Sequence, residues 1–120
     1  MSDADDRPLR FWTVEEARAY LPRLRELVER VRDAAQSAAT VRTNGDAAPD
    51  PADVETAVTE LSEGDIVLRD TDVGLIDFHA LGADGVVYFL CWKLDEDALE
   101  WWHFPDEGFA GRKRLPRDPA

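Results

Sequence analysis

The spacing of the apolar residues changes at Gly64, and this change limits the fold more than any other feature of the 120-residue chain. Before Gly64, apolar side chains recur every three or four residues, which places them on one face of a helix. After Gly64, they form short runs separated by four-residue segments of turn-forming type, as in strands joined by hairpins. The sequence therefore predicts an α+β fold, in which an N-terminal helical hairpin packs on an antiparallel β-meander of three to four strands.

The first predicted helix is long. Thr13 is a typical N-cap, and Glu16 three residues later completes a capping box. A stripe of apolar residues continues from Val14 to Ala35 at helical spacing. Pro22 lies inside this stripe, where it removes one backbone hydrogen bond and crowds the preceding turn. We expect a kink at Pro22, with a break into two helices as the alternative.

The remaining boundaries follow from composition. Residues 37–50 are rich in small and polar side chains, which predicts a flexible connection between the helices. The second helix is expected to begin at Pro51, with Asp50 as its N-cap, and to end at Gly64. The chain then divides into a disordered N-terminus (1–10), a single domain (11–115) and a C-terminal tail (116–120).

Hairpin length sets the register of the predicted meander and decides which residues share a face. If each separator is a four-residue loop, Leu81 lies opposite Val86 and Leu94 opposite Leu99. Alternation then directs one set of side chains toward the helices and the other set away from them. The expected core face carries Val67, Ile76, Phe78, Ala80, Val87, Phe89, Cys91, Trp102 and Phe104. The opposite face carries Ile66, Leu68, Leu75, Asp77, His79, Tyr88, Leu90, Trp92, Trp101 and His103.

The opposite face holds residues of the types that bind zinc or iron. The candidate ligands are His103, Asp77 and His79, with Glu96 or Cys91 as additions. The predicted register, however, sets Leu90 between Asp77 and His103 and directs Cys91 into the core. A divalent metal cofactor is therefore not expected, and the favoured role of Asp77 is to satisfy a turn or an arginine.

An arginine near the C-terminus gives this face a second interpretation. The Gly-Phe-Ala-Gly loop before Arg112 could bring its side chain over the sheet. There it would pair with Asp77 or hold an anionic ligand. A surface loop anchored by Phe109 is the alternative.

Four tryptophans are the most informative aromatic residues. Trp92 and Trp101 share the opposite face with a tyrosine, where they would form a dimer interface or the wall of a ligand pocket. The interface is favoured because so short a chain has a limited core of its own. Trp102 is expected to anchor the core. The full set of candidate ligand-binding residues is Asp77, Trp92, Trp101, Trp102, His103 and Arg112.

Charge and cysteine usage limit the partners. The net charge is −12, and residues 46–100 hold fifteen acidic residues against Arg69 and Lys93. Such a chain would repel nucleic acid and anionic membranes, so neither is expected as a partner. No apolar run is long enough to span a membrane, the N-terminus lacks the order of a secretion signal, and Cys91 is the only cysteine. These features predict a cytoplasmic protein.

Several short motifs occur in an order that resembles a known family. The matching segments are Leu21–Pro22, Gly74 to Phe78, Leu90 to Trp92, Trp102–His103 and Gly108 to Arg112. Together with the first helix, they resemble a prokaryotic family of domains of unknown function, number 2203. The resemblance covers residues 11–34 and 64–115 and implies no established activity. It implies that Asp77, Trp92, Trp102, His103 and Arg112 belong to the motif set of the family.

Two functions fit these observations. The favoured one is a homodimeric interaction or regulatory domain, because the long helix and the aromatic sheet face both present apolar surface. The alternative is a domain that binds a small molecule or a metal, with or without catalysis. It would use Asp77, His103 and Arg112 beside the tryptophans.

Overall fold

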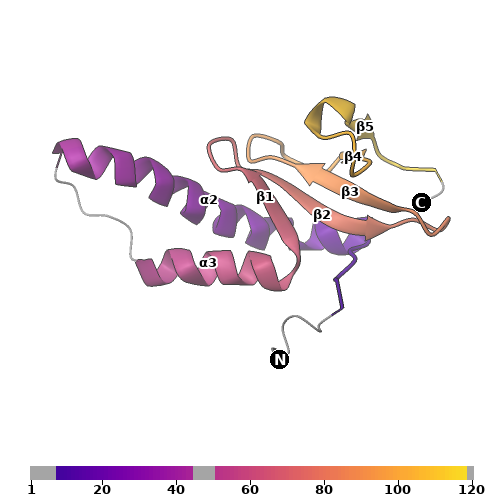
Figure 1. The fold of residues 1–120 in the computed structure, drawn as a ribbon, viewed down its shortest axis with the longest axis horizontal. Helices are drawn as coiled ribbons and strands as arrows, with labels where there is room; N and C mark the ends of the chain where they lie inside the picture. The colour runs from indigo at the N-terminus through magenta and orange to yellow at the C-terminus, as the bar shows by residue number, and fades with distance from the viewer. Residues whose placement is uncertain (1–7, 45–50, 119–120) are drawn as a thin grey trace.

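The computed structural model describes residues 8–44 and 51–118, which form an α+β fold (Figure 1). Helix α2 spans Val14–Asn44 and helix α3 spans Pro51–Glu63. An antiparallel sheet follows, with its strands in chain order: β1 (Ile66–Asp70), β2 (Leu75–Leu81), β3 (Val87–Trp92), β4 (Trp101–His103) and β5 (Lys113–Arg114). The predicted helices and antiparallel meander are confirmed, and the short strand β5 extends the sheet beyond the expected three to four strands.

Helix α2 begins where the sequence predicts and ends later. The backbone N–H of Thr13 donates to Glu16 Oε1, and that of Glu16 donates to Thr13 Oγ1, both at 3.0 Å, which is the expected capping box. The helix runs through Pro22 without a break, so the alternative of two helices is wrong. It also includes residues 37–44, which composition assigns to the flexible connection. Two alanines and an arginine in this stretch favour helix.

Other predicted boundaries lie partly outside the described residues. These include residues 1–7 of the expected disordered N-terminus and residues 45–50 of the inter-helix connection, with the N-cap Asp50. Arg10, in contrast, is held in place: its backbone N–H donates to Asp65 Oδ2 at 2.7 Å. Its guanidinium lies 3.5 Å from the centre of the Trp12 ring.

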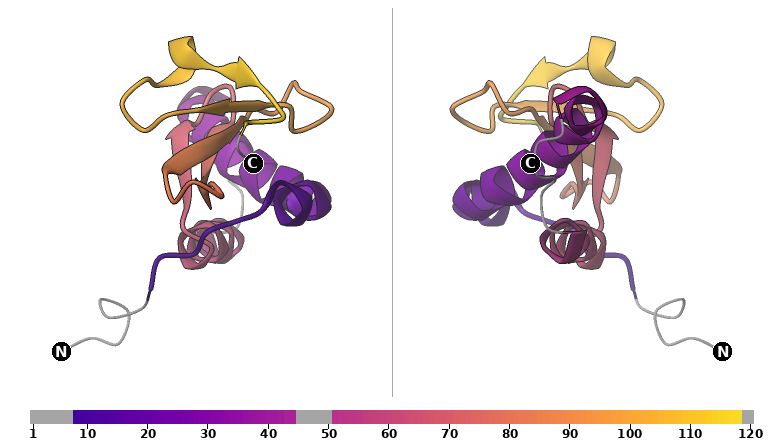
Figure 2. Two further views of the ribbon diagram at one scale, coloured as in Figure 1. Left: turned by 90° about the vertical axis from the view of Figure 1, so that its right-hand side faces the viewer. Right: turned by 90° about the vertical axis from the view of Figure 1, so that its left-hand side faces the viewer.

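The hydrophobic core lies between the helices and one face of the sheet. Helix α2 packs along this face, and α3 lies beside it near the β1 edge (Figures 1 and 2). The face that the sheet turns toward the helices is called the core face. Its buried side chains are Ile66, Ile76, Phe78, Ala80, Tyr88, Leu90, Trp92 and Trp102, packed against Leu21, Leu24, Leu27 and Val28 of α2 and Ala57 and Leu61 of α3. Within the described residues, neither helix has the length and apolar composition that crossing a membrane requires.

The hairpin between β2 and β3 differs from the predicted one by a single residue. Leu81 pairs with Val87 rather than Val86, so the loop has five residues. Gly85 adopts a left-handed conformation with φ of 79°, and Asp84 Oδ1 accepts a hydrogen bond from the N–H of Val86 at 3.0 Å. A left-handed glycine before the returning strand is typical of a hairpin that inserts one extra residue.

This extra residue reverses the two faces of β3. Leu90 and Trp92 lie in the core, whereas Phe89 and Cys91 lie on the opposite face, here called the site face. The prediction for β3 is therefore wrong, including the burial of Cys91 in the core. The prediction for β1 is wrong in the same sense, because Val67 pairs with Asp77 and shares the site face with it.

The connection from β3 to β4 also differs from a tight hairpin. Cys91 pairs with Trp101, which leaves residues 93–100 as one long loop. Arg25 of α2 donates to the carbonyl oxygens of Leu94 and Glu96, at 2.9 and 3.1 Å. The Arg25 guanidinium therefore holds this loop against α2. It satisfies backbone carbonyl groups that the opposite strand would otherwise pair in a tight hairpin.

The predicted C-terminal tail begins with a segment that belongs to the fold. Arg117 is buried, its Nη2 lies 2.9 Å from Asp84 Oδ2, and its guanidinium stacks 4.7 Å from the centre of the Tyr88 ring. The bond from Arg117 holds the pKa of the Asp84 carboxyl below its usual value. The segment therefore ties the chain end to the hairpin between β2 and β3.

Candidate metal centre

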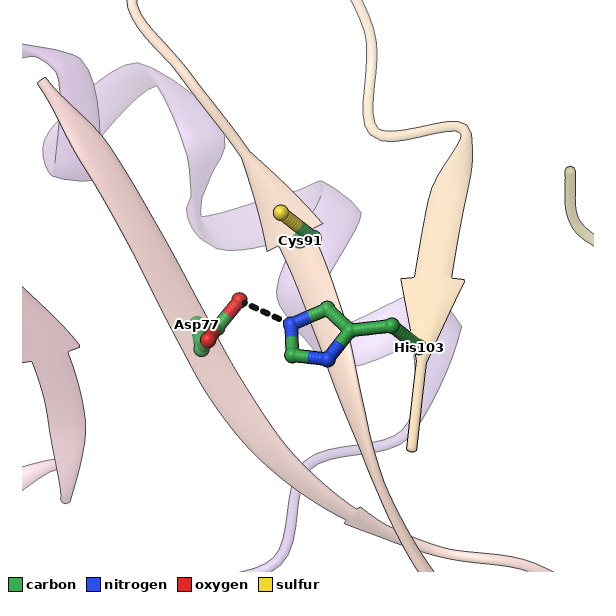
Figure 3. A group of neighbouring side chains, drawn as sticks. All are labelled: Asp77, Cys91 and His103. Carbon is green, nitrogen blue, oxygen red and sulfur yellow. Dashed lines mark hydrogen bonds and ion pairs between the residues drawn. The ribbon is translucent and has the colours of Figure 1, made fainter. Parts of the chain in front are cut away.

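Three neighbouring strands bring Asp77, Cys91 and His103 together on the site face (Figure 3). Asp77 of β2 pairs with Cys91 of β3, and His103 follows two residues after Trp101, the partner of Cys91 on β4. Since side chains two residues apart on a strand point to the same side, all three project away from the helices. One potential ligand atom from each residue lies within 4.8 Å of the other two.

All three residues are almost completely buried, with 2%, 1% and 2% of their surface exposed for Asp77, Cys91 and His103. A buried carboxylate is costly unless it is paired or binds a cation. Here Asp77 has two partners: Oδ1 lies 3.0 Å from His103 Nε2, and Oδ2 accepts a hydrogen bond from Arg69 Nε at 2.9 Å. The expected role of Asp77 in satisfying an arginine is thus confirmed, with Arg69 as the arginine.

The His103 ring is fixed by hydrogen bonds at both nitrogens. Nδ1 lies 2.8 Å from the carbonyl oxygen of Phe104, which can only accept, so Nδ1 carries a proton. Nε2 then faces Asp77 Oδ1, and a proton must lie between these two atoms to prevent their lone pairs from meeting. The ring therefore aims Nε2 at the point where the three side chains meet.

Cys91 is a protonated thiol in this environment. Burial, and after it the charge of the Asp77 carboxylate, raises the pKa of the Cys91 thiol to about 12. A thiol of this kind is a poor nucleophile at neutral pH, because the thiolate is the reactive form. Nucleophilic catalysis by Cys91 alone is therefore not what this site favours.

A cavity of about 220 Å³ opens beside the three side chains. It is lined by Arg69, Leu75, Asp77, Cys91, His103, Pro105, Gly108 and Phe109. Its polar side chains belong to the sheet, while the loop after β4 supplies an apolar wall. The three candidate ligands can thus be reached from one side.

The structure brings together only part of the predicted site. Asp77 and His103 share a face as predicted, and Trp101 lies on it as well. His79 turns away from them, and its Nδ1 lies 2.7 Å from the carbonyl oxygen of Asp65. His79 is therefore not a member of the cluster, and this geometry gives no support to its prediction as a metal ligand.

Two of the tryptophans lie on the other side of the sheet. Trp92 and Trp102 are buried in the core of the same chain. The indole N–H of Trp92 donates to the carbonyl oxygen of Glu96 at 3.0 Å. Trp102 anchors the core as predicted, whereas Trp92 does not line the site.

Arg112 lies near the site face but does not reach Asp77. Its Nη2 lies 2.7 Å from both carboxylate oxygens of Glu96, in an ion pair that is mostly buried. The guanidinium also lies 4.9 Å from the centre of the Trp101 ring and 4.7 Å from that of Phe109. The expected pairing of Arg112 with Asp77 is wrong. Glu96, which the sequence offered as an additional metal ligand, is instead the partner of Arg112 in this ion pair.

Cys91 is the member of the cluster that the sequence analysis placed on the wrong face, and the contact of Arg69 with Asp77 was not predicted. The signal that would have placed Cys91 correctly is the Asp-Gly pair at 84–85, which favours a hairpin with a left-handed glycine and one added residue. The position of Arg69 follows from the register of β1 against β2.

Comparison with known proteins places the chain in a family without assigning an activity. No curated protein and no solved structure matches it. The sequence profile of the family described as "Uncharacterized conserved protein (DUF2203)" matches residues 10–115, a span that includes both helices and all five strands. The chain belongs to this family of uncharacterised conserved proteins, DUF2203.

Proposed function

We propose that this protein binds a divalent transition metal, with zinc as the first candidate, through Asp77, Cys91 and His103. The observation that carries the proposal is the convergence of three buried ligand atoms, from three neighbouring strands, within 4.8 Å of one another. Carboxylate, thiolate and imidazole are all common zinc ligands, and a thiolate favours zinc over magnesium or calcium.

The distances suit a metal of this size. With bonds of about 2.0 Å to nitrogen or oxygen and about 2.3 Å to sulfur, tetrahedral ligand atoms lie about 3.3–3.5 Å apart. Asp77 Oδ1 and His103 Nε2 are already 3.0 Å apart. One ligand atom from each residue, the Cys91 sulfur included, lies within 4.8 Å of the other two, so a side-chain adjustment of roughly 1 Å would complete the site.

The contacts behind the ligand atoms also support a metal site. Zinc-bound histidines commonly donate their second ring N–H to a carbonyl or carboxylate, which fixes the ring. His103 Nδ1 has such a contact with the Phe104 carbonyl oxygen. Arg69 holds Oδ2 of Asp77 and leaves Oδ1 directed at the cluster. Each of these two ligands is thus oriented by a partner outside the cluster.

Metal binding would also explain why a thiol and a carboxyl–imidazole pair are buried together. Zinc would take the position of the proton between Asp77 and His103, and it would displace the proton of Cys91. Three protein ligands leave one coordination position, which faces the cavity. Zinc sites with three protein ligands and an open position are typical of catalysis, whereas structural sites have four protein ligands.

Elemental analysis tests the proposal. The full chain is dialysed against a chelator, reloaded with zinc, desalted and analysed for metal per chain. We expect stoichiometric zinc in the wild type and background zinc in His103→Gln and Cys91→Ser. His79→Gln is the matched control, because it removes the other histidine of the same sheet and should retain the metal. Circular dichroism checks that each variant is folded.

Two results would contradict the proposal. One is a folded wild-type protein that retains no metal after loading. The other is equal zinc in the wild type and in the variants of Cys91 and His103.

A homodimer remains a second prediction. The apolar helix stripe and the aromatic face that suggested it are used within the single chain, because Leu24, Leu27, Leu90 and Trp92 are all buried in its core. We therefore rank an interaction or regulatory function below metal binding. Light scattering at micromolar concentration measures the oligomeric state, and a monomer would contradict the prediction. The cytoplasmic location and the exclusion of nucleic acid and membranes also remain predictions.

A further inference from the structure

We propose, on the basis of the proposed metal site, that the cavity beside Asp77, Cys91 and His103 binds a small carboxylate. One carboxylate oxygen would take the open position on the metal. Arg69 would supply the opposing charge, and the apolar wall would contact the carbon chain of the ligand.

The charge of the loaded cavity favours an anion. A divalent metal is neutralised by the Asp77 carboxylate and the Cys91 thiolate, and neutral His103 adds no charge. Arg69 is the remaining charged side chain among the described residues that line the cavity, so the net charge there is positive. An anionic ligand would meet an unbalanced positive charge in a partly enclosed space, where such interactions are strengthened.

Arg69 has donors to spare. Its Nε is used by Asp77, and no described residue accepts a hydrogen bond from either of its terminal nitrogens. The guanidinium is held in position because it stacks 5.1 Å from the centre of the Phe89 ring. A planar guanidinium with free donors on a fixed support suits recognition of a planar carboxylate.

The size and lining of the cavity define the ligand further. A volume of about 220 Å³ equals the share of about seven liquid water molecules, so the ligand has few heavy atoms. Leu75, Pro105 and Phe109 give the wall opposite the charged groups an apolar surface. A short alkyl carboxylate would match both the charged side and the apolar wall of the cavity. Inorganic phosphate would leave the apolar wall without a partner.

Cobalt(II) in place of zinc makes binding visible, because its absorption spectrum changes when a ligand enters the coordination sphere. The cobalt-loaded full chain is titrated with formate, acetate, propionate, butyrate and inorganic phosphate. We expect spectral shifts with the carboxylates and an affinity that rises about twofold to fourfold for each added CH₂ group, until the cavity is filled. Phosphate should bind more weakly than propionate.

Two matched pairs of variants separate the parts of the proposal. Arg69→Gln should weaken propionate binding about tenfold, while Arg114→Gln, an exposed arginine of β5 outside the cavity, should not. Phe109→Ala should flatten the dependence on chain length, while Leu81→Ala, with a similar exposed fraction on β2, should preserve it. The spectral change in each titration is normalised to the fraction of chains in that sample that hold cobalt. The Phe109 pair decides the test if Arg69→Gln fails to load cobalt.

The outcomes distinguish this inference from the proposed function. If the chain takes up no metal, the proposed function fails. If it takes up cobalt but no carboxylate alters the spectrum, or if phosphate binds best, the metal site stands and the carboxylate inference is overturned. Equal propionate binding by wild type, Arg69→Gln and Phe109→Ala would also overturn it.

Discussion

The two faces of the sheet bury different kinds of side chain. The core face is apolar and is covered by two helices that contribute leucines, valine and alanine. The site face buries an aspartate, a cysteine and a histidine, and the segment after β4, with its short 3-10 helix at Phe109–Gly111, lines a cavity there in place of an α-helix. Burial of polar groups costs free energy that burial of apolar groups does not. The difference supports the proposal that the core face maintains the fold and that the site face binds the metal.

The largest effect expected from this comparison is on stability. Phe78 is fully buried on the core face, and its replacement in Phe78→Ala should lower the free energy of unfolding by about 3–5 kcal/mol. Phe89→Ala is the matched variant on the site face, one strand away. It should cost clearly less, because Phe89 borders the face that no helix covers. Urea unfolding of both variants measures the difference, and equal losses would contradict the division of roles.

The next effect is stabilisation by the metal. Zinc at about 100 times its Kd should add about 2.7 kcal/mol to the free energy of unfolding of the wild type, because it binds only the folded state. Cys91→Ala should remain folded and gain no comparable stability. Thermal unfolding with and without zinc gives the values. Equal stabilisation of the wild type and Cys91→Ala by zinc would contradict the proposed role of Cys91 as a ligand.

The pH dependence of metal affinity tests the chemistry of Cys91. Its pKa is raised to about 12, so the thiol is protonated at neutral pH and zinc must displace that proton. Affinity should therefore rise with pH, about tenfold per pH unit for each proton released. Competition with a chelator of known affinity, repeated across neutral pH, measures the slope. A flat profile would contradict the displacement of protons by zinc, that of Cys91 included.

The smallest expected effect is on the ion pair between α2 and α3, which lies on neither face of the sheet. It serves as a reference for the variants of the two faces. Bonds from Arg23 and Tyr20 lower the pKa of the Glu60 carboxyl to about 2, and they connect α2 to α3. Because the folded pKa is lowered from 4.5, this stabilisation is present above about pH 4.5 and is lost as the pH falls toward 2. Glu60→Gln should reduce the acid sensitivity of unfolding and leave zinc binding at neutral pH unchanged. The effect is small because both partners are partly exposed.

The elements of the fold follow from sequence because each has a local signal. The capping box at Thr13 and the change of period at Gly64 depend on neighbouring residues only. The position of Cys91 depends on a register, and a hairpin longer by one residue moves it from one face to the other. Asp77 and His103 were predicted on one face because the registers on both sides of β3 differ by one residue, and the two differences cancel.

The contacts of Arg112 illustrate what local patterns cannot provide. Its partner Glu96 lies in the loop of residues 93–100, whose shape is set by contacts with Arg25 of α2. Long-range contacts between two irregular segments have no periodic signal in the sequence. The Gly-Phe-Ala-Gly motif indicates that the chain turns back, and the tertiary fold decides which acid it meets.

Anomalous X-ray diffraction at the zinc absorption edge, on crystals of the zinc-loaded full chain, tests the central claim most directly. We predict a single strong anomalous peak about 2.0 Å from Asp77 Oδ1 and His103 Nε2 and about 2.3 Å from the Cys91 sulfur. The fourth position should face the cavity. A zinc-loaded crystal with no peak at this point, and with the direct contact of 3.0 Å between Asp77 and His103 retained, would contradict the account.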